Sequence, residues 1–228
     1  MKKVIIILYT ILYRLFHVLD GKIKISDSSL WYMTVRLSKN ANVSLCKATV
    51  RRSAFNVSGE GNVVCAENVA MDNCEIRISG TSNTVTIEPH CIIRNSVIVV
   101  NGNNCRVTIG ESTRVGSMYM VCMGQDNYIS VGQDCMIADN IDIWATDSHP
   151  IFNDNGEICN PSKPVSIGNH VWLGKHAKVL KGVTIHDNAI IGMNAMVTTD
   201  VPEGALAVGA PCIVVKNNVN WSREYIAV

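Results

Sequence analysis

The sequence predicts an all-β fold, a parallel β-helix in which short strands wind into stacked coils. Two internal repeats predict it. The first is an unbroken repeat of six residues between Ile167 and Val201. A period of six fits neither an α-helix, which repeats about every 3.6 residues, nor a simple alternating hairpin. It fits three short strands joined by tight turns, which make a coil of about 18 residues.

The six-residue repeat places a branched aliphatic residue at one position and a small or medium apolar residue four places later. The aliphatic positions are Ile167, Leu173, Val179, Ile185, Ile191 and Val197, and the second positions are Val171, Ala177, Val183, Ala189, Ala195 and Val201. Glycine directly follows the aliphatic residue at Gly168, Gly174 and Gly192. We expect the aliphatic side chain to point into a narrow triangular core, with glycine where a Cβ would obstruct the backbone.

A second repeat covers the first half of the chain. Gly59, Gly80, Gly102 and Gly124 recur at intervals of 21, 22 and 22 residues, each before an Asn-x-Val-x-Ile-like segment. These intervals equal one coil of about 18 residues plus a short turn insertion. An ordinary β-sandwich is the alternative, but consecutive six-residue units in one register disfavour it.

Composition narrows the class of protein. A chain of 228 residues that is 47% hydrophobic can bury the core of one domain or one elongated stack. The net charge of +1 is not gathered into blocks, so no basic surface for nucleic acid is expected. The nine cysteines form no Cys-x-x-Cys pair, which argues against a disulfide framework or a thiolate zinc site and favours a reducing cytoplasm. We expect Cys65, Cys105 and Cys135 to be buried apolar residues.

Residues 1–20 are predicted to form an apolar helix. The apolar run from Val4 to Leu19 contains Arg14 and is followed by Asp20-Gly21, which resembles a helix stop rather than a signal cleavage site. The run is too short to span a bilayer, which needs about 20 residues. Two roles stay open for residues 1–19, packing within an oligomer or lying on a membrane surface.

Several motifs together resemble the hexapeptide-repeat acyltransferases, and most closely the galactoside, maltose and polysaccharide O-acetyltransferases. The motifs are Thr146–Pro150, Val165–Gly174, Gly182–Ile185, Val201-Pro202 and Val208–Pro211. The close resemblance runs from about Tyr128 to Lys216, and the N-terminal half shares only the repeat.

The resemblance implies a left-handed solenoid over residues 21–205, with a tail over 206–228. Handedness follows from the resemblance alone, since parallel crossovers in proteins are generally right-handed. It further implies a homotrimer that holds acetyl-CoA in a groove between neighbouring subunits. The segment 149–164 is rich in Asn, Asp, Gly and Pro, so it should leave the coils and project as a loop.

The resemblance assigns His149 as the catalytic base of acetyl transfer. An imidazole with an ordinary pKa near ~6.5 can accept the proton of a sugar hydroxyl at neutral pH. The backbone amide of Lys175 corresponds to the position that meets the developing oxyanion. Asp126 and Ser117 fall near positions that bind and orient the acceptor.

For the acyl donor, the resemblance places an aromatic residue along the pantetheine groove, contact positions beside it, and a basic residue near the nucleotide phosphates. The residues are Trp172, Gly174, Met193, Thr198 and Lys216. Ile213 stands where related enzymes often carry an arginine, so phosphate binding depends more on Lys216 or on a neighbouring chain.

The predicted activity is acetyl-CoA-dependent O-acetylation of a sugar hydroxyl on a bacterial surface polysaccharide or its precursor. The expected location is the cytoplasm, at or near the inner face of the membrane. N-acetylation of an amino sugar or small amine is the main alternative.

Two other classes of protein are compatible with a β-helix. A zinc enzyme resembling the γ-class carbonic anhydrases would use His149, His170 and His176 as ligands, but His170 and His176 fall on successive strands and hence on different faces of the coil. We therefore expect no metal. A non-catalytic β-helix scaffold is the other class, and it gives no reason for His149 to accompany the C-terminal motifs.

Overall fold

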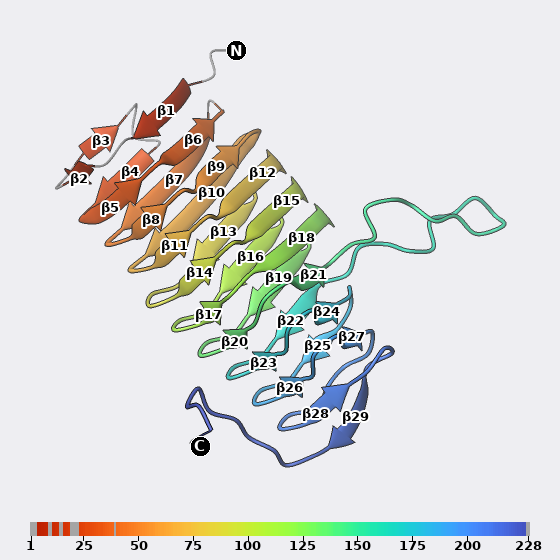
Figure 1. Ribbon diagram of the computed structural model, residues 1–228. Helices are drawn as coiled ribbons and strands as arrows, with labels where there is room; N and C mark the ends of the chain where they lie inside the picture. The colour runs from red at the N-terminus through yellow and green to blue at the C-terminus, as the bar shows by residue number, and fades with distance from the viewer. Residues whose placement is uncertain (1–3, 9–10, 14–15, 19–22, 39, 227–228) are drawn as a thin grey trace.

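The computed structural model describes residues 4–8, 11–13, 16–18, 23–38 and 40–226. From Ile23 onward the chain winds into a parallel β-solenoid whose coils stack along one axis (Figure 1). Each full coil gives one strand to each of three faces, and each strand pairs with the strand one coil away. The predicted all-β parallel coil is confirmed.

The three faces are built from strands that recur in chain order. The first face comprises β4 (Ile23–Ser26), β7 (Asn40–Cys46), β10 (Glu60–Glu67), β13 (Thr84–Ile87), β16 (Arg106–Ile109), β19 (Tyr128–Val131), β22 (Val165–Ile167) and β25 (Thr184–Ile185). The second comprises β5 (Ser28–Trp31), β8 (Thr49–Arg51), β11 (Ala70–Asp72), β14 (Ile92–Arg94), β17 (Arg114–Val115), β20 (Met136–Ile137), β23 (Trp172–Leu173), β26 (Ile190–Ile191) and β28 (Leu206–Val208). The third comprises β6 (Met33–Leu37), β9 (Ala54–Val57), β12 (Glu75–Thr81), β15 (Val97–Asn103), β18 (Met118–Gln125), β21 (Ile141–Trp144), β24 (Lys178–Val179) and β27 (Met196–Val197).

Paired residues show how the two sequence repeats differ in space. On the first face Thr84 pairs with Arg106, 22 residues later, whereas Ser166 pairs with Thr184, 18 residues later. The extra residues of the earlier coils lie largely on the third face, where β15 has seven residues and β24 has two. Both halves therefore form the same three-faced coil.

The core lies inside the three faces and consists of side chains that alternate with outward ones. In β13, for example, Val85 and Ile87 are buried while Thr84 and Thr86 lie at the surface. Each fully buried branched aliphatic side chain contributes about 1.5 to 3 kcal/mol.

Cys105 and Cys135 are buried in this core as expected, but Cys65 is only half-buried because its side chain points outward between buried Val64 and Ala66. Cys74 is also a buried free thiol, and burial raises its pKa to about 11. Such thiols are protonated and unreactive at neutral pH.

The glycines of the six-residue repeat are needed because the next coil approaches closely. A Cβ on Gly174 would lie 2.8 Å from the carbonyl oxygen of Ile191 in the following coil. The left-handed backbone of the turn falls two residues later, on His176 with φ 63°. The expected obstruction is therefore real, and at Gly174 it comes from the neighbouring backbone.

The N-terminal residues form strands, and the predicted helix over 1–20 is not found in the described part of that segment. β1 (Val4–Leu8) pairs antiparallel with β6, β2 (Ile11–Tyr13) with β5, and β3 (Phe16–Val18) with β4. The first coil would otherwise expose unpaired backbone groups on all three faces, and these β-branched and aromatic residues pair with them instead. No helix long and apolar enough to cross a membrane occurs in the described residues.

The C-terminal residues first continue the second face and then turn back along the molecule. β28 adds to β26 in parallel, and β29 (Ile213–Lys216) pairs with β28 antiparallel. Beyond β29 the tail passes over the turns that precede β23 and β20 (Figure 1). Coil pairing thus reaches past residue 205.

Candidate active site

A long loop interrupts the solenoid where His149 lies. It leaves the third face after β21 and returns to the first face at β22, and it projects well beyond the coils (Figure 1). Within it, Phe152 and Ile158 form an antiparallel bridge. The loop meets the coils at residues 146–149 and 160–162, here called the neck. His149 is exposed at the neck, and its N–H donates to the carbonyl of Asp147 at 2.8 Å.

The neck is tied to the next coil by an ion pair. Lys181, in the turn after β24, lies 2.5 Å from the Asp147 carboxylate, and its side chain is only 17% exposed. This ammonium group, with help from the Asn160 amide, lowers the pKa of Asp147. The loop therefore begins from a fixed point although most of its residues are exposed.

Asp126 and Thr198 lie on the same edge of the solenoid as the loop, the edge between the third and first faces, here called the His149 edge. Asp126 occupies the turn between β18 and β19, and Thr198 follows β27. The Asp126 carboxylate accepts a hydrogen bond from Asn104 at 2.6 Å. Both residues are exposed and lie above or below the loop along the stack.

Ser117, Lys175 and Met193 lie on a different edge, between the second and third faces, here called the Lys175 edge. They occupy the turns before β18, β24 and β27. Backbone bonds link successive turns of this edge, as in the 3.0 Å bond from Asn194 N–H to the Lys175 carbonyl. Met193 is 64% exposed. Gly174 immediately precedes Lys175 at this edge.

The two edges border the third face, and one chain does not bring them together. The four residues of β21 span roughly 10 to 15 Å between the edges at about 3.3 Å per residue. Trp172 points outward from the second face beside the Lys175 edge, and Lys216 lies on β29 at the C-terminal end. Of the residues expected to bind the acyl donor, only Thr198 lies on the His149 edge, and the others occupy separate parts of the solenoid.

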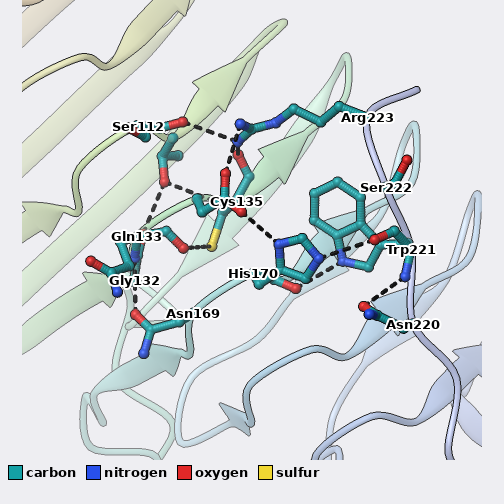
Figure 2. Close-up of polar contacts among 12 residues, drawn as sticks. Ser112, Gly132, Gln133, Cys135, Asn169, His170, Asn220, Trp221, Ser222 and Arg223 are labelled. Atoms are coloured by element: carbon teal, nitrogen blue, oxygen red, sulfur yellow. Dashed lines mark hydrogen bonds and ion pairs between the residues drawn. The ribbon is translucent and has the colours of Figure 1, made fainter. Parts of the chain in front are cut away.

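His170 contacts the C-terminal tail and lies apart from His149. Its Nδ1 lies 2.7 Å from the Asp134 carboxylate, and its ring stacks on Trp221 with 4.2 Å between centroids (Figure 2). Arg223 completes the contact, 2.7 Å from the same carboxylate. In the described ranges, no group of three or more His, Cys, Asp or Glu residues is arranged to hold a metal ion.

Sequence reasoning missed this tail and its contact with Trp172. The Trp221 ring lies 6.1 Å from the Trp172 ring, and the Trp221 indole N–H donates to the His170 carbonyl at 2.8 Å. The tail therefore packs beside Trp172, the aromatic residue expected to line the pantetheine groove. A lone Trp and Arg near the terminus carried no periodic signal, so only the tertiary contacts reveal them.

Comparisons with known proteins agree with this architecture. Residues 164–199 match the family described as bacterial transferase hexapeptide (six repeats). The polysialic acid O-acetyltransferase of Neisseria meningitidis is 32% identical over 152 residues, which cover 56% of this chain and 70% of that protein. The corresponding enzyme of Escherichia coli O1:K1 is 31% identical over 140 residues, which cover 61% of this chain and 45% of that protein. The match thus spans less than half of the Escherichia coli relative.

A solved structure extends the likeness to the N-terminal coils. The crystal structure of the polySia-specific acetyltransferase NeuO superposes with a TM-score of 0.75 at 28% identity, covering 86% of this chain and 91% of that one. The chain belongs to the hexapeptide-repeat acetyltransferases. Its most similar relatives include enzymes that O-acetylate polysialic acid, and this confirms the resemblance seen in the sequence.

Proposed function

We propose that this protein transfers the acetyl group of acetyl-CoA to a hydroxyl of a bacterial surface polysaccharide, with polysialic acid as the first acceptor to test. The observation that carries the proposal is the likeness to NeuO over 86% of the chain. It includes the long N-terminal coils, which the hexapeptide match at residues 164–199 leaves out. These coils give an extended surface suited to a polymer.

His149 is proposed as the general base of a direct transfer. Its imidazole takes the proton from the acceptor hydroxyl while the oxygen attacks the thioester carbonyl. The tetrahedral oxyanion is stabilised by the backbone N–H of Lys175. The C–S bond then breaks, and the leaving thiolate receives the proton from His149. Proton and electron pairs balance without a covalent enzyme intermediate.

The proposed site requires more than one chain. His149, Asp126 and Thr198 lie on one edge, whereas Ser117, Gly174, Lys175 and Met193 lie on another, with Trp172 beside the latter. A homotrimer that turns the third face toward its axis joins the His149 edge of one subunit to the Lys175 edge of the next. The left-handed winding implied by the family is part of this proposal.

The third face has the surface expected for such packing. Its outward side carries half-buried Val97 and Val99 and the aromatic pair Tyr119 and Trp144, whose ring centroids are 5.9 Å apart. This apolar patch lies beside charged residues of the same face, among them the Asp142–Lys178 ion pair. An exposed apolar patch of this kind is stable in water when another subunit covers it. Acetyl-CoA would then lie between subunits, with Trp172 and Met193 along pantetheine and Lys216 toward the phosphates.

The test is the substitution His149→Ala, assayed by CoA release with polysialic acid and acetyl-CoA. Loss of a positioned base should lower turnover by about 10²- to 10⁴-fold while the KM for acetyl-CoA changes little. His186→Ala is the control, because His186 is exposed in the turn after β25, on the edge between the first and second faces and away from both edges of the proposed site, and it should change turnover only a few-fold. Turnover of His149→Ala within a few-fold of the parent would remove the proposed mechanism.

We also propose that the protein acts in the cytoplasm, where its acyl donor is made. Peripheral attachment of residues 1–19 to the inner face of the membrane stays a prediction. The antiparallel pairing of β1, β2 and β3 offers these apolar residues a different role.

A further inference from the structure

Asn160 lies on the returning side of the projecting loop, opposite His149. Its side-chain amide makes three hydrogen bonds across the neck. Nδ2 donates to the Asp147 carboxylate at 2.8 Å and to the His149 carbonyl at 3.0 Å, and Oδ1 accepts from the Ile151 N–H at 2.6 Å. A carboxylate and a carbonyl can only accept and a backbone N–H can only donate, so the orientation of the amide is determined.

The three hydrogen bonds of the Asn160 side chain, here called the Asn160 bracket, are anchored to the next coil of the solenoid. Lys181 donates to the Asp147 carboxylate and also to the backbone carbonyl of Asn160, at 2.8 Å. Its side chain is mostly buried and comes from the next coil. A second bond, from the Ser162 hydroxyl to the Thr146 hydroxyl at 3.0 Å, closes the base of the loop. The neck is therefore fixed relative to the coils, although the tip of the loop is exposed.

We propose that Asn160 is a positioning residue that fixes the backbone of His149. The inference rests on the proposed role of His149 as the base. The carbonyl of His149 and the N–H of Ile151 are both bonded to one side chain, and the N–H of His149 is bonded to Asp147. With the backbone fixed on both sides, the imidazole can move only by rotation about its own side-chain bonds. Such support matters because a displacement of about 1 Å can cost about 100-fold in rate.

The chemistry of the bracket requires an amide. Aspartate at position 160 could still accept from Ile151, but it would lose both donated bonds and place a carboxylate beside Asp147. Alanine would lose all three bonds without adding repulsion. We therefore expect Asn160→Asp to impair the enzyme at least as much as Asn160→Ala, an order that a purely space-filling role does not give.

The experiment compares Asn160→Ala and Asn160→Asp with the control Asn155→Ala, which changes the same residue type at the tip of the same loop. We expect the Asn160 variants to lose about 10- to 100-fold in kcat. The KM for acetyl-CoA and the melting temperature should stay near those of the parent, since neither the donor residues nor the core is touched. Asn155→Ala should match the parent in kcat, in the KM for acetyl-CoA and in melting temperature.

A double variant tests whether Asn160 acts through His149. When His149 is already Ala, adding Asn160→Ala should cost nothing further, because residues that act as one unit are not additive. A further loss equal to that of the single variant would overturn the inference. So would Asn160→Ala with parental kcat.

Hydrogen exchange provides a readout that does not depend on activity. Asn160→Ala should speed exchange at the amide of Ile151, which loses its acceptor, while amides of the core strands stay protected. Unchanged exchange at Ile151 would show that the bracket does not hold the loop. If instead His149→Ala keeps parental turnover, the proposed function fails, and the exchange data still decide whether Asn160 fixes the neck.

Discussion

Single glycines decide how closely the N-terminal coils stack. Gly59, Gly80, Gly102 and Gly124 follow one another along an edge, and three of them have φ near 100°. A Cβ on Gly80 would lie only 1.9 Å from the carbonyl oxygen of Gly102. Buried Asn62 and Asn83 bond to these same carbonyls at 2.9 and 2.7 Å. The glycine and asparagine positions thus form one hydrogen-bonded ladder.

This ladder predicts the effect of Gly80→Ala. The substitution should destabilise the protein by about 3 kcal/mol or more, because the positive φ costs about 1 to 2 kcal/mol and the clash forces the coils apart. Gly156→Ala is the matched control, since Gly156 has φ 77° but a Cβ there would meet nothing within 4 Å. Gly156→Ala should lower the free energy of unfolding only by the cost of the positive φ, about 1 to 2 kcal/mol. Denaturant unfolding followed by circular dichroism measures both, and equal losses would contradict the steric account.

At the scale of the element, the N-terminal strands close an open end of the solenoid. β1 pairs with β6 along five residues, from Val4 with Leu37 to Leu8 with Met33. An uncovered parallel coil would present the edges of β4, β5 and β6 to other molecules, which is a route to aggregation. The apolar composition that resembled a membrane-binding helix in the sequence is equally suited to strands that cover this end.

Deletion of residues 1–18 should therefore lower the melting temperature by about 5 °C or more and cause concentration-dependent association. The control is removal of residues 224–228, because Tyr225 and Ile226 are almost fully exposed. Light scattering and thermal melting compare the two. A shortened chain that stays stable and dispersed but no longer binds lipid vesicles would favour the membrane role instead.

At the scale of the whole molecule, the proposed homotrimer would divide the chemistry between two edges that belong to different subunits. In the proposed mechanism the His149 edge supplies the base, and the Lys175 edge supplies the oxyanion amide and part of the donor groove. Because both edges border the third face, the proposed three-fold packing would place each edge against its complement on a neighbour. An isolated chain would carry the two halves of the site on separate edges, so it would have no complete site.

Subunit mixing tests this division. His149→Ala impairs one edge, and Met193→Arg, which puts a bulky charge into the proposed groove, impairs the other. Each variant alone should have little activity, but co-assembled trimers should recover about a quarter of parental turnover, since half of each edge is intact at random. Mixing His149→Ala with Asn160→Ala, both on one edge, is the control and should recover much less. No recovery in the first mixture would contradict a shared site.

The sequence by itself determined the coil, because a period of six can bury an apolar stripe only in short stacked strands. It also determined the projecting loop, since its residues cannot continue the coil. It could not determine the N-terminal strands, whose form depends on the unpaired edges they meet, nor the contact of Trp221 and Arg223 with His170 and Asp134, about 50 to 90 residues away in the chain. The bracket of Asn160 around His149 and the separation of the two edges were likewise decided by the tertiary structure, because both arise from contacts between coils, and a local pattern does not specify these.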